Sequence, residues 1–138
     1  MRFVSVRSLA IGLLLAVGFL SACTSTAKDL FKGVDRIVAV GDLHGDYDQY
    51  IKVLTTNGLV DEQLRWQGGK THFVQLGDVV DRGPDSIRII RHLMKLEKEA
   101  RKKGGRVHVL IGKGGVMNIQ GDLRYVHPGE YSALIAKN

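Results

Sequence analysis

The stretch RIVAVGDLHG, residues 36–45, decides the fold class of this chain of 138 residues. Its first five residues are mostly apolar and end at Gly41, as a buried β-strand does. Asp46 follows and can cap a helix. A helical spacing of i, i+3, i+4 and i+7 then connects Tyr47, Tyr50, Ile51 and Leu54. The stretch and its continuation therefore predict a strand, a loop and a helix that ends near Gly58.

Strands and helices alternate along the rest of the chain. Residues 64–66 and 71–76 predict a hairpin that leads into a second buried strand. A long amphipathic helix is predicted from Pro84 to Gly104, and a third strand over residues 106–111. The remaining residues predict two short helices around His127-Pro128. The order β-α-β-α-β predicts an α/β fold, a layered, mainly parallel sheet with flanking helices.

Each predicted strand ends in a glycine-containing loop, and ligands of such sheets bind beyond the carboxyl ends of the strands. The first two loops place five chemically active side chains along this rim: Asp42, His44, Asp78, Asp81 and Arg82. Carboxylates and imidazole together bind divalent transition metals, and a pair of such metals can clamp a phosphoryl group. An arginine fork suits phosphate oxygens. Taken singly, either loop could also be a turn or a helix cap.

Three segments resemble the calcineurin-like metallophosphoesterase superfamily, near its bacterial phosphoprotein-phosphatase-like branch. They are GDLHG at 41–45, GDVVDRG at 77–83 and MNIQGDLRYVHPGEY at 117–131. The resemblance runs from about Arg36 to the end of the chain. It implies part of a metallophosphoesterase fold over residues 34–138 and hydrolysis of phosphate esters. The implied cofactors are two divalent ions, Mn, Fe or Zn.

The same resemblance assigns roles to the rim residues. Asp42 and His44 would hold the first metal, and Asp78 would bridge both metals. Asp81 and Arg82 are the implied catalytic residues. Asp81 would orient a catalytic imidazole, and Arg82 would bind the substrate phosphate.

The third family motif, Gly-Asn-His-Glu, is altered here to GKGG at residues 112–115. Lys113 replaces an amide ligand of the second metal, and an ammonium group cannot coordinate a cation. Gly114 and Gly115 replace an imidazole and a carboxylate. The family's later histidine loops have no counterpart in this chain. We therefore expect one bound metal or none and an impaired enzyme. The alternative is an inactive or truncated relative that at most binds metal or phosphate as an envelope lipoprotein.

The N-terminal segment predicts an export signal. Basic residues precede an apolar run from Leu9 to Leu20, and small residues follow. Leu20-Ser21-Ala22-Cys23 resembles the lipobox of bacterial lipoproteins. This implies a signal peptide over residues 1–22, a lipidated Cys23 and a tether over 23–33. Thr24, in place of aspartate, implies the periplasmic side of the outer membrane. A short transmembrane anchor is the alternative, although the run is shorter than the roughly 20 residues that span a bilayer.

Composition narrows the possible functions. Apolar residues make up 44% and charged residues 25%, which excludes a disordered chain. The single cysteine excludes an intramolecular disulfide. The formal net charge of +6 does not predict nucleic-acid binding, because the basic run at 101–103 lacks interleaved aromatic residues. The expected partners are a phosphate-ester substrate and a membrane reached through the lipid anchor. The oligomeric state stays open, and a purely structural envelope protein would leave both motif loops unexplained.

Overall fold

The computed structural model describes residues 30–135, and the residues from Gly33 onward form one compact unit. All helices and strands named below belong to that unit. The predicted signal peptide and the predicted lipidation site Cys23 lie outside the described residues. None of the helices within residues 30–135 combines the length and the hydropathy needed to span a bilayer.

A parallel three-stranded sheet forms the centre of the unit. Its strands lie in the order β1-β2-β3, and Ile37 is level with His72, which is level with Arg106. The strands are β1 (Ile37–Val40), β2 (His72–Gln75) and β3 (Arg106–Val109). This arrangement confirms the predicted α/β fold with a parallel sheet.

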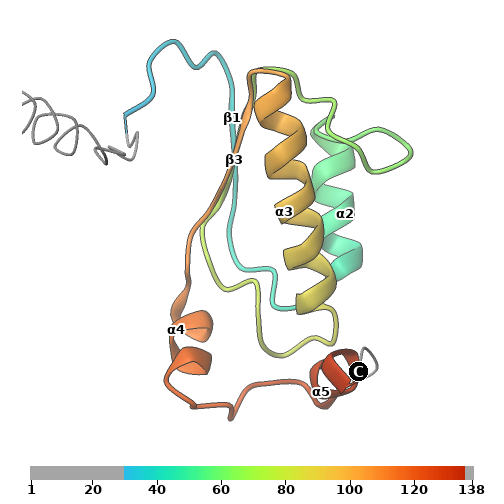
Figure 1. Cartoon of the computed structure of the whole chain (residues 1–138), viewed down its shortest axis with the longest axis vertical. Helices are drawn as coiled ribbons and strands as arrows, with labels where there is room; N and C mark the ends of the chain where they lie inside the picture. The colour runs from blue at the N-terminus through green and yellow to red at the C-terminus, as the bar shows by residue number, and fades with distance from the viewer. Residues whose placement is uncertain (1–29, 136–138) are drawn as a thin grey trace, which may run out of the picture. The chain divides into compact units, whose positions relative to one another are not determined.

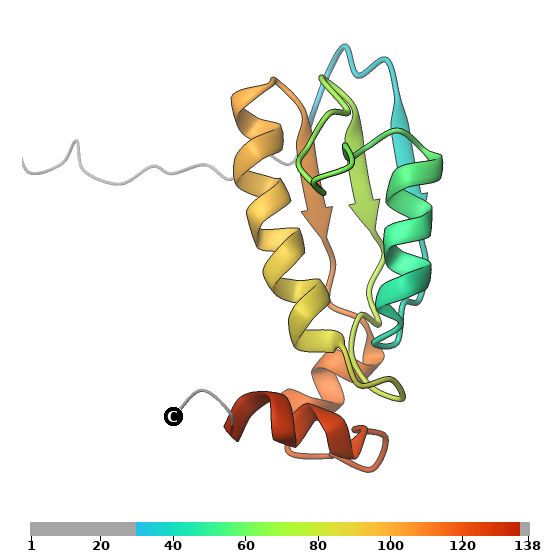
Figure 2. The same cartoon turned by 90° about the vertical axis from the view of Figure 1, so that its right-hand side faces the viewer.

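Two long helices cover one face of the sheet, and two short ones follow β3. The helices are α2 (Tyr47–Thr56), α3 (Ser86–Lys102), α4 (Lys113–Ile119) and α5 (Pro128–Ile135). Helices α2 and α3 connect successive strands and lie side by side on the same face of the sheet (Figure 1 and Figure 2). The short helices α4 and α5 lie beyond the carboxyl ends of the strands. The carboxyl ends of all three strands therefore meet at the end of the sheet that α4 and α5 approach.

The hydrophobic core lies between the sheet and the two long helices. Its fully buried members include Tyr50, Leu54, Phe73, Ile89, Leu93 and Leu96. Burial of a large apolar side chain stabilises a fold by roughly 1.5–3 kcal/mol. The predicted helical stripes supply this core, and it fixes the position of both long helices against the strands.

The predicted hairpin of residues 64–66 with 71–76 is wrong. Trp66 instead forms an isolated antiparallel bridge with Val60, and among residues 30–135 β2 pairs with the parallel strands β1 and β3 alone. The indole of Trp66 is 1% exposed, and its Nε1–H donates to the carbonyl of Gly69 at 3.1 Å. The Gly68-Gly69 pair predicts the turn of a hairpin. Burial of this large ring instead determines how the segment around Trp66 pairs.

The two long helices begin in different ways. Asp46 caps α2 as predicted, because its carboxylate accepts a hydrogen bond from the Gln49 backbone N–H at 3.0 Å. Asp85 stands at the cap position of α3 but makes no such bond. The Ser86 N–H donates instead to the carboxylate of Glu130, at 2.6 Å. A residue of α5 therefore caps α3 from 44 positions away along the chain.

A half-buried chain of hydrogen bonds fixes the tautomer of His92. Its Nε2–H donates to the Leu64 carbonyl at 2.8 Å, since a carbonyl only accepts. Its Nδ1 therefore accepts from the Tyr50 hydroxyl at 2.9 Å. Burial lowers the pKa of His92 below its ordinary value and raises the pKa of Tyr50. The native fold thus holds a neutral imidazole between two core elements.

We expect the free energy of unfolding to fall as the pH drops below about 6.5, the ordinary histidine pKa. Below that value the unfolded chain binds a proton at His92, whereas the folded chain resists it. Urea unfolding followed by circular dichroism at pH 7.5 and pH 5.5 measures the difference. His92→Gln should reduce this pH dependence without abolishing it, because burial also lowers the pKa of His72. An undiminished pH dependence in His92→Gln would contradict the assignment.

Candidate metal centre

The first two motif loops lie against each other at the carboxyl ends of β1 and β2. The backbone carbonyl of Asp78 accepts hydrogen bonds from the N–H groups of Leu43 and His44, each at 3.0 Å. The Gly45 N–H donates to the Val79 carbonyl at 2.8 Å. These bonds connect the two loops directly, so residues about 35 positions apart share one rim, as the parallel sheet predicts.

Asp42, His44 and Asp78 form a cluster that can hold a metal ion. One ligand atom from each lies within 4.8 Å of the other two. Asp42 is exposed, and the other two are half-buried. The structure therefore brings together the three residues that the sequence predicts as metal ligands.

The orientation of the His44 ring suits a cation. Its Nδ1 lies 3.0 Å from the Val80 carbonyl, so Nδ1 carries the proton in the neutral ring. Its Nε2 then presents a lone pair toward Asp42, whose Oδ2 is 3.5 Å away. In the neutral ring two acceptor atoms therefore face each other, and a cation between them could bind to both. A carbonyl partner on the second ring nitrogen is also the arrangement that holds histidine ligands in place in known metal sites.

Asp78 connects the two loops through its backbone and contributes its side chain to the metal-binding cluster. Its Oδ1 accepts the Gly114 backbone N–H at 2.7 Å, which leaves Oδ2 without a described hydrogen bond. Gly112 and Gly77 pass very close to this point, because a Cβ on Gly112 would lie 2.1 Å from the Asp78 nitrogen. The close glycine contacts allow the loops after β2 and β3 to meet at the Asp78 carboxylate.

Strained backbone is concentrated at the rim. Five non-glycine residues within 30–135 have positive φ, and four of them are candidate site residues. The four are His44 (47°), Asp78 (49°), Asp81 (73°) and Arg82 (66°). Such conformations cost about 1–3 kcal/mol each and cluster at functional sites. Because these backbone conformations lower the stability of the fold, their concentration at the rim indicates a functional role for its geometry.

The loops also depend on two glycines in contact. A Cβ on Gly83 would lie 2.5 Å from the His44 carbonyl oxygen, and one on Gly45 would lie 2.6 Å from the Gly83 oxygen. The Gly83 N–H donates to that His44 carbonyl at 2.9 Å. A side chain at either position would therefore push the loops apart. At Gly45 it would also strain the backbone, because φ there is 69°.

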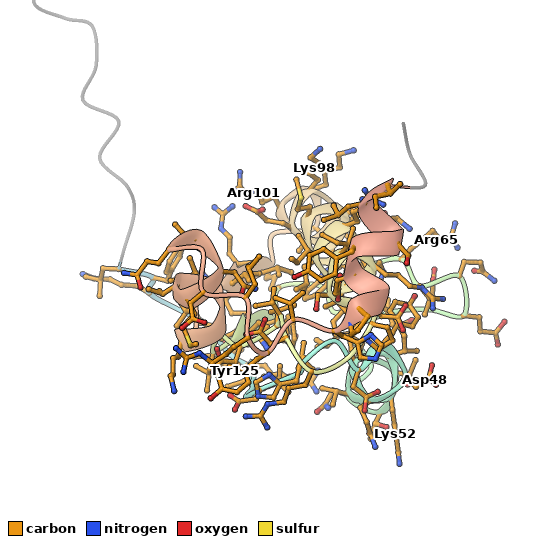
Figure 3. All side chains as sticks on the ribbon, turned by 90° about the horizontal axis from the view of Figure 1, so that it is seen from below. Asp48, Lys52, Arg65, Lys98, Arg101 and Tyr125 are labelled. Atoms are coloured by element: carbon orange, nitrogen blue, oxygen red, sulfur yellow. The ribbon has the colours of Figure 1, made fainter. Side chains whose placement is uncertain are left out.

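Asp81 and Arg82 lie beside the cluster. A cavity of about 50 Å³ is lined by His44, Asp78, Asp81, Arg82 and Lys113, among others. Asp81 is 4% exposed, whereas the Arg82 side chain is exposed. The Arg82 backbone N–H donates to the carbonyl of Tyr125, which lies on the connection from α4 to α5 (Figure 3). Four of the five predicted rim residues thus surround one small space, and the exposed Asp42 lies beside it in the metal-binding cluster.

Asn118 is a site neighbour that the sequence did not reveal. Its Nδ2 donates to Asp81 Oδ1 at 3.0 Å. The other carboxylate oxygen of Asp81 points at Gly114, where an added Cβ would lie only 2.5 Å away. Asn118 lies in the segment 117–131 that resembles the family, but the sequence assigns it no role, because it reaches Asp81 only through the placement of α4 after β3.

The residues of the altered third motif form the first turn of α4, whereas the sequence predicts a loop there. Lys113 begins the helix and lines the small cavity. Gly114 is buried and donates its N–H to Asp78, and Gly115 lies against Ile111. Asp81 therefore faces a position that has no side chain, and Lys113 is exposed at the rim of the small cavity.

Comparison with known proteins decides the family. The model of the calcineurin-like phosphoesterases matches residues 35–112, more than half of the chain. The chain belongs to the calcineurin-like phosphoesterase family. This metal-dependent family is the one that the GDLHG and GDVVDRG loops predict. The match covers β1 to β3 and therefore both motif loops.

Several proteins that are similar to this chain are named as phosphatases. Shewanella-like protein phosphatase 2 of Arabidopsis thaliana is 45% identical over 96 residues, which are 70% of this chain and 25% of that protein. Shewanella-like protein phosphatase 1 of Plasmodium berghei is 39% identical over 74% of this chain and 28% of its own. The crystal structure of the cold-active protein-tyrosine phosphatase of a psychrophile, Shewanella sp., superposes with a TM-score of 0.69 at 35% identity, over 77% of this chain and 33% of its own. The chain spans about a quarter to a third of the length of these relatives.

Proposed function

We propose that this chain is a metal-dependent phosphoesterase with impaired turnover, which acts on phosphate esters. The observation that carries the proposal is the convergence of Asp42, His44 and Asp78 within 4.8 Å. Membership of a metal-dependent hydrolase family supports it, as do relatives named as protein phosphatases. We expect at most one tightly held divalent ion, Mn, Fe or Zn, at these three residues.

In the proposed reaction, the divalent ion and the side chains of the protein have separate roles. A divalent ion at this site supplies Lewis acidity toward a phosphoryl oxygen and makes water more acidic. Arg82 would bind the phosphate oxygens through two parallel hydrogen bonds, because its side chain is exposed at the rim of the small cavity. Asp42, His44 and Asp78 would hold the ion beside that phosphate.

The impairment follows from the residues opposite Asp81. The leaving alkoxide needs a proton, and Gly114 has no side chain to give one. Positioned general-acid catalysis contributes about 10²–10⁴ in rate. Lys113 adds a positive charge where a second ion would need ligands. We therefore expect slow hydrolysis and weak binding of a second ion.

Hydrolysis of p-nitrophenyl phosphate by the full chain, with and without Mn²⁺, tests the proposal. We expect a slow Mn²⁺-dependent rate that Asp78→Asn removes and that Asp48→Asn, a change on the exposed surface of α2, leaves unchanged. A rate no higher than that of Mn²⁺ alone would overturn the proposal for this chain.

A second candidate function is binding of metal or phosphate without turnover. The substitution of Lys113 and Gly114 for a metal ligand and a proton donor favours it. The number of metal ions that stay bound per chain after dialysis distinguishes this candidate from an enzyme with a complete two-metal site. One ion per chain or none agrees with an impaired or inactive site, whereas two tightly held ions would contradict both of our proposals.

We also propose that the mature chain is a lipoprotein. Residues 1–22 would be removed as a signal peptide, Cys23 would carry the lipid, and residues 23–33 would connect it to the phosphoesterase domain at 34–138. The sequence Leu20-Ser21-Ala22-Cys23 supports this, and Thr24 favours the periplasmic side of the outer membrane. Labelled palmitate should be incorporated into the chain and absent from Cys23→Ser, and label in Cys23→Ser would refute the assignment.

A further inference from the structure

A second cavity, of about 260 Å³, lies where the start of α3 meets α4 and α5. Asp81 borders both this cavity and the small one beside the metal ligands. The proposed phosphoesterase chemistry uses none of its other walls. Its volume is somewhat below that of sites for drug-sized ligands, so it suits a smaller molecule.

Two buried polar atoms in the walls have no hydrogen-bond partner among the described residues, namely Ser86 Oγ and Asn118 Oδ1. Ser86 is 2% exposed. The amide of Asn118 is oriented by its donation to Asp81, since a carboxylate only accepts. Its oxygen therefore points away from Asp81 as an acceptor. A buried polar atom that lacks a partner is costly, so both atoms favour a ligand that bonds to them.

The polar part of the cavity is negatively charged. Asp81 and Glu130 are 4% and 6% exposed, and both line the cavity. Glu130 accepts the Ser86 N–H, and Asp81 accepts from Asn118. The described residues that line the cavity include no lysine, arginine or histidine. Two buried carboxylates and an amide oxygen together select a group that donates several hydrogen bonds and carries a positive charge.

The remaining walls are apolar, and three of them are also exposed: Leu123, Tyr131 and Leu134. They favour an organic cation over a bare metal ion, because a hard cation needs oxygen ligands on most sides. An alkyl chain would pack on these residues while its charged head reaches the buried acceptors. We propose that this cavity binds a primary alkylammonium group carried on a short apolar chain.

Calorimetric titration of the full chain, without added metal or phosphate ester, tests this proposal. We expect n-hexylammonium to bind at least about tenfold more tightly than 1-hexanol, because the ammonium bonds to charged acceptors. Hexanoate should not bind. Equal binding of all three, tighter binding of hexanol or hexanoate, or no binding of hexylammonium would overturn the proposal. N-acetyl-lysine N-methylamide shows whether the ammonium can come from a polypeptide side chain as well as from a free amine.

Two variants locate the binding in this cavity. Glu130→Gln removes a charge and should weaken hexylammonium binding about tenfold or more. Glu62→Gln, on an exposed loop, is the matched control and should not change it. Since Glu130 also caps α3, Leu134→Trp provides a second test by obstructing the cavity with a change at an exposed position. Unchanged binding in a folded Glu130→Gln or in Leu134→Trp would place the amine elsewhere and refute the proposal. Failure of the phosphoesterase proposal would leave these results unaffected, because no step of this experiment uses metal or hydrolysis.

Discussion

Replacement of Asp78 by asparagine is expected to lower the affinity for Mn²⁺ by about 100-fold or more. Mutation of a residue that merely orients a metal ligand already costs about 10–100-fold in affinity, so loss of a ligand's charge should cost at least as much. The backbone at Asp78 organises the rim, since its carbonyl accepts two N–H groups from the first loop. Asparagine keeps this backbone and can still accept the Gly114 N–H through its amide oxygen. The change therefore removes the negative charge of the ligand while it preserves the connections between the loops.

Isothermal titration of Mn²⁺ into the full chain and the variant measures this loss. Asp48→Asn serves as the matched control, because Asp48 lies on the exposed surface of α2 (Figure 3) and outside the cluster. Unfolding by urea should give similar midpoints for Asp78→Asn and the unaltered chain in the absence of metal. Equal Mn²⁺ affinities in the two proteins would show that Asp78 is not a ligand and would remove the central argument for the metal centre.

Much of the rim could be predicted because a parallel sheet brings the ends of its strands together. Once residues 36–40 and 71–76 are recognised as parallel strands, Asp42 and Asp78 must follow them at the same edge. The capping aspartate Asp46 is equally local, since it reaches a backbone N–H only three residues on. These predictions needed only short-range patterns and one rule of topology.

Other contacts could not be predicted because they depend on how distant elements pack. Glu130 caps α3 and Asn118 supports Asp81, yet each partner lies 37 or more residues away along the chain. No periodicity or turn signal links such positions. The sequence likewise predicts a loop at the first turn of α4, because Gly112, Gly114 and Gly115 lie at or beside it and glycine disfavours helices. The bond from the Gly114 N–H to Asp78 offsets that preference.

Trp66→Ala is expected to lower the free energy of unfolding by about 3–5 kcal/mol, the range for truncation of a buried large aromatic side chain. The ring is 1% exposed and closely packed, because a Cβ on Gly68 would lie 2.9 Å from it and one on Gly105 would lie 3.2 Å from it. The backbone of Trp66 also bonds to Glu99 of α3 at 2.8 Å and to Lys103, the C-cap of that helix, at 2.6 Å. Loss of the ring would leave a cavity beside these bonds.

Urea unfolding followed by circular dichroism measures the effect of Trp66→Ala, with Arg65→Ala as the matched control. Arg65 is exposed and pairs only with neighbours in its own loop, so its removal should cost less than about 1 kcal/mol. A role of Trp66 in a substrate cleft would predict a different result from a role in the core. A core residue changes stability and leaves Mn²⁺ affinity intact in the folded variant, whereas a cleft residue changes ligand binding with little effect on stability. Because Trp66 is buried and lines neither of the two cavities beside Asp81, we expect the first result.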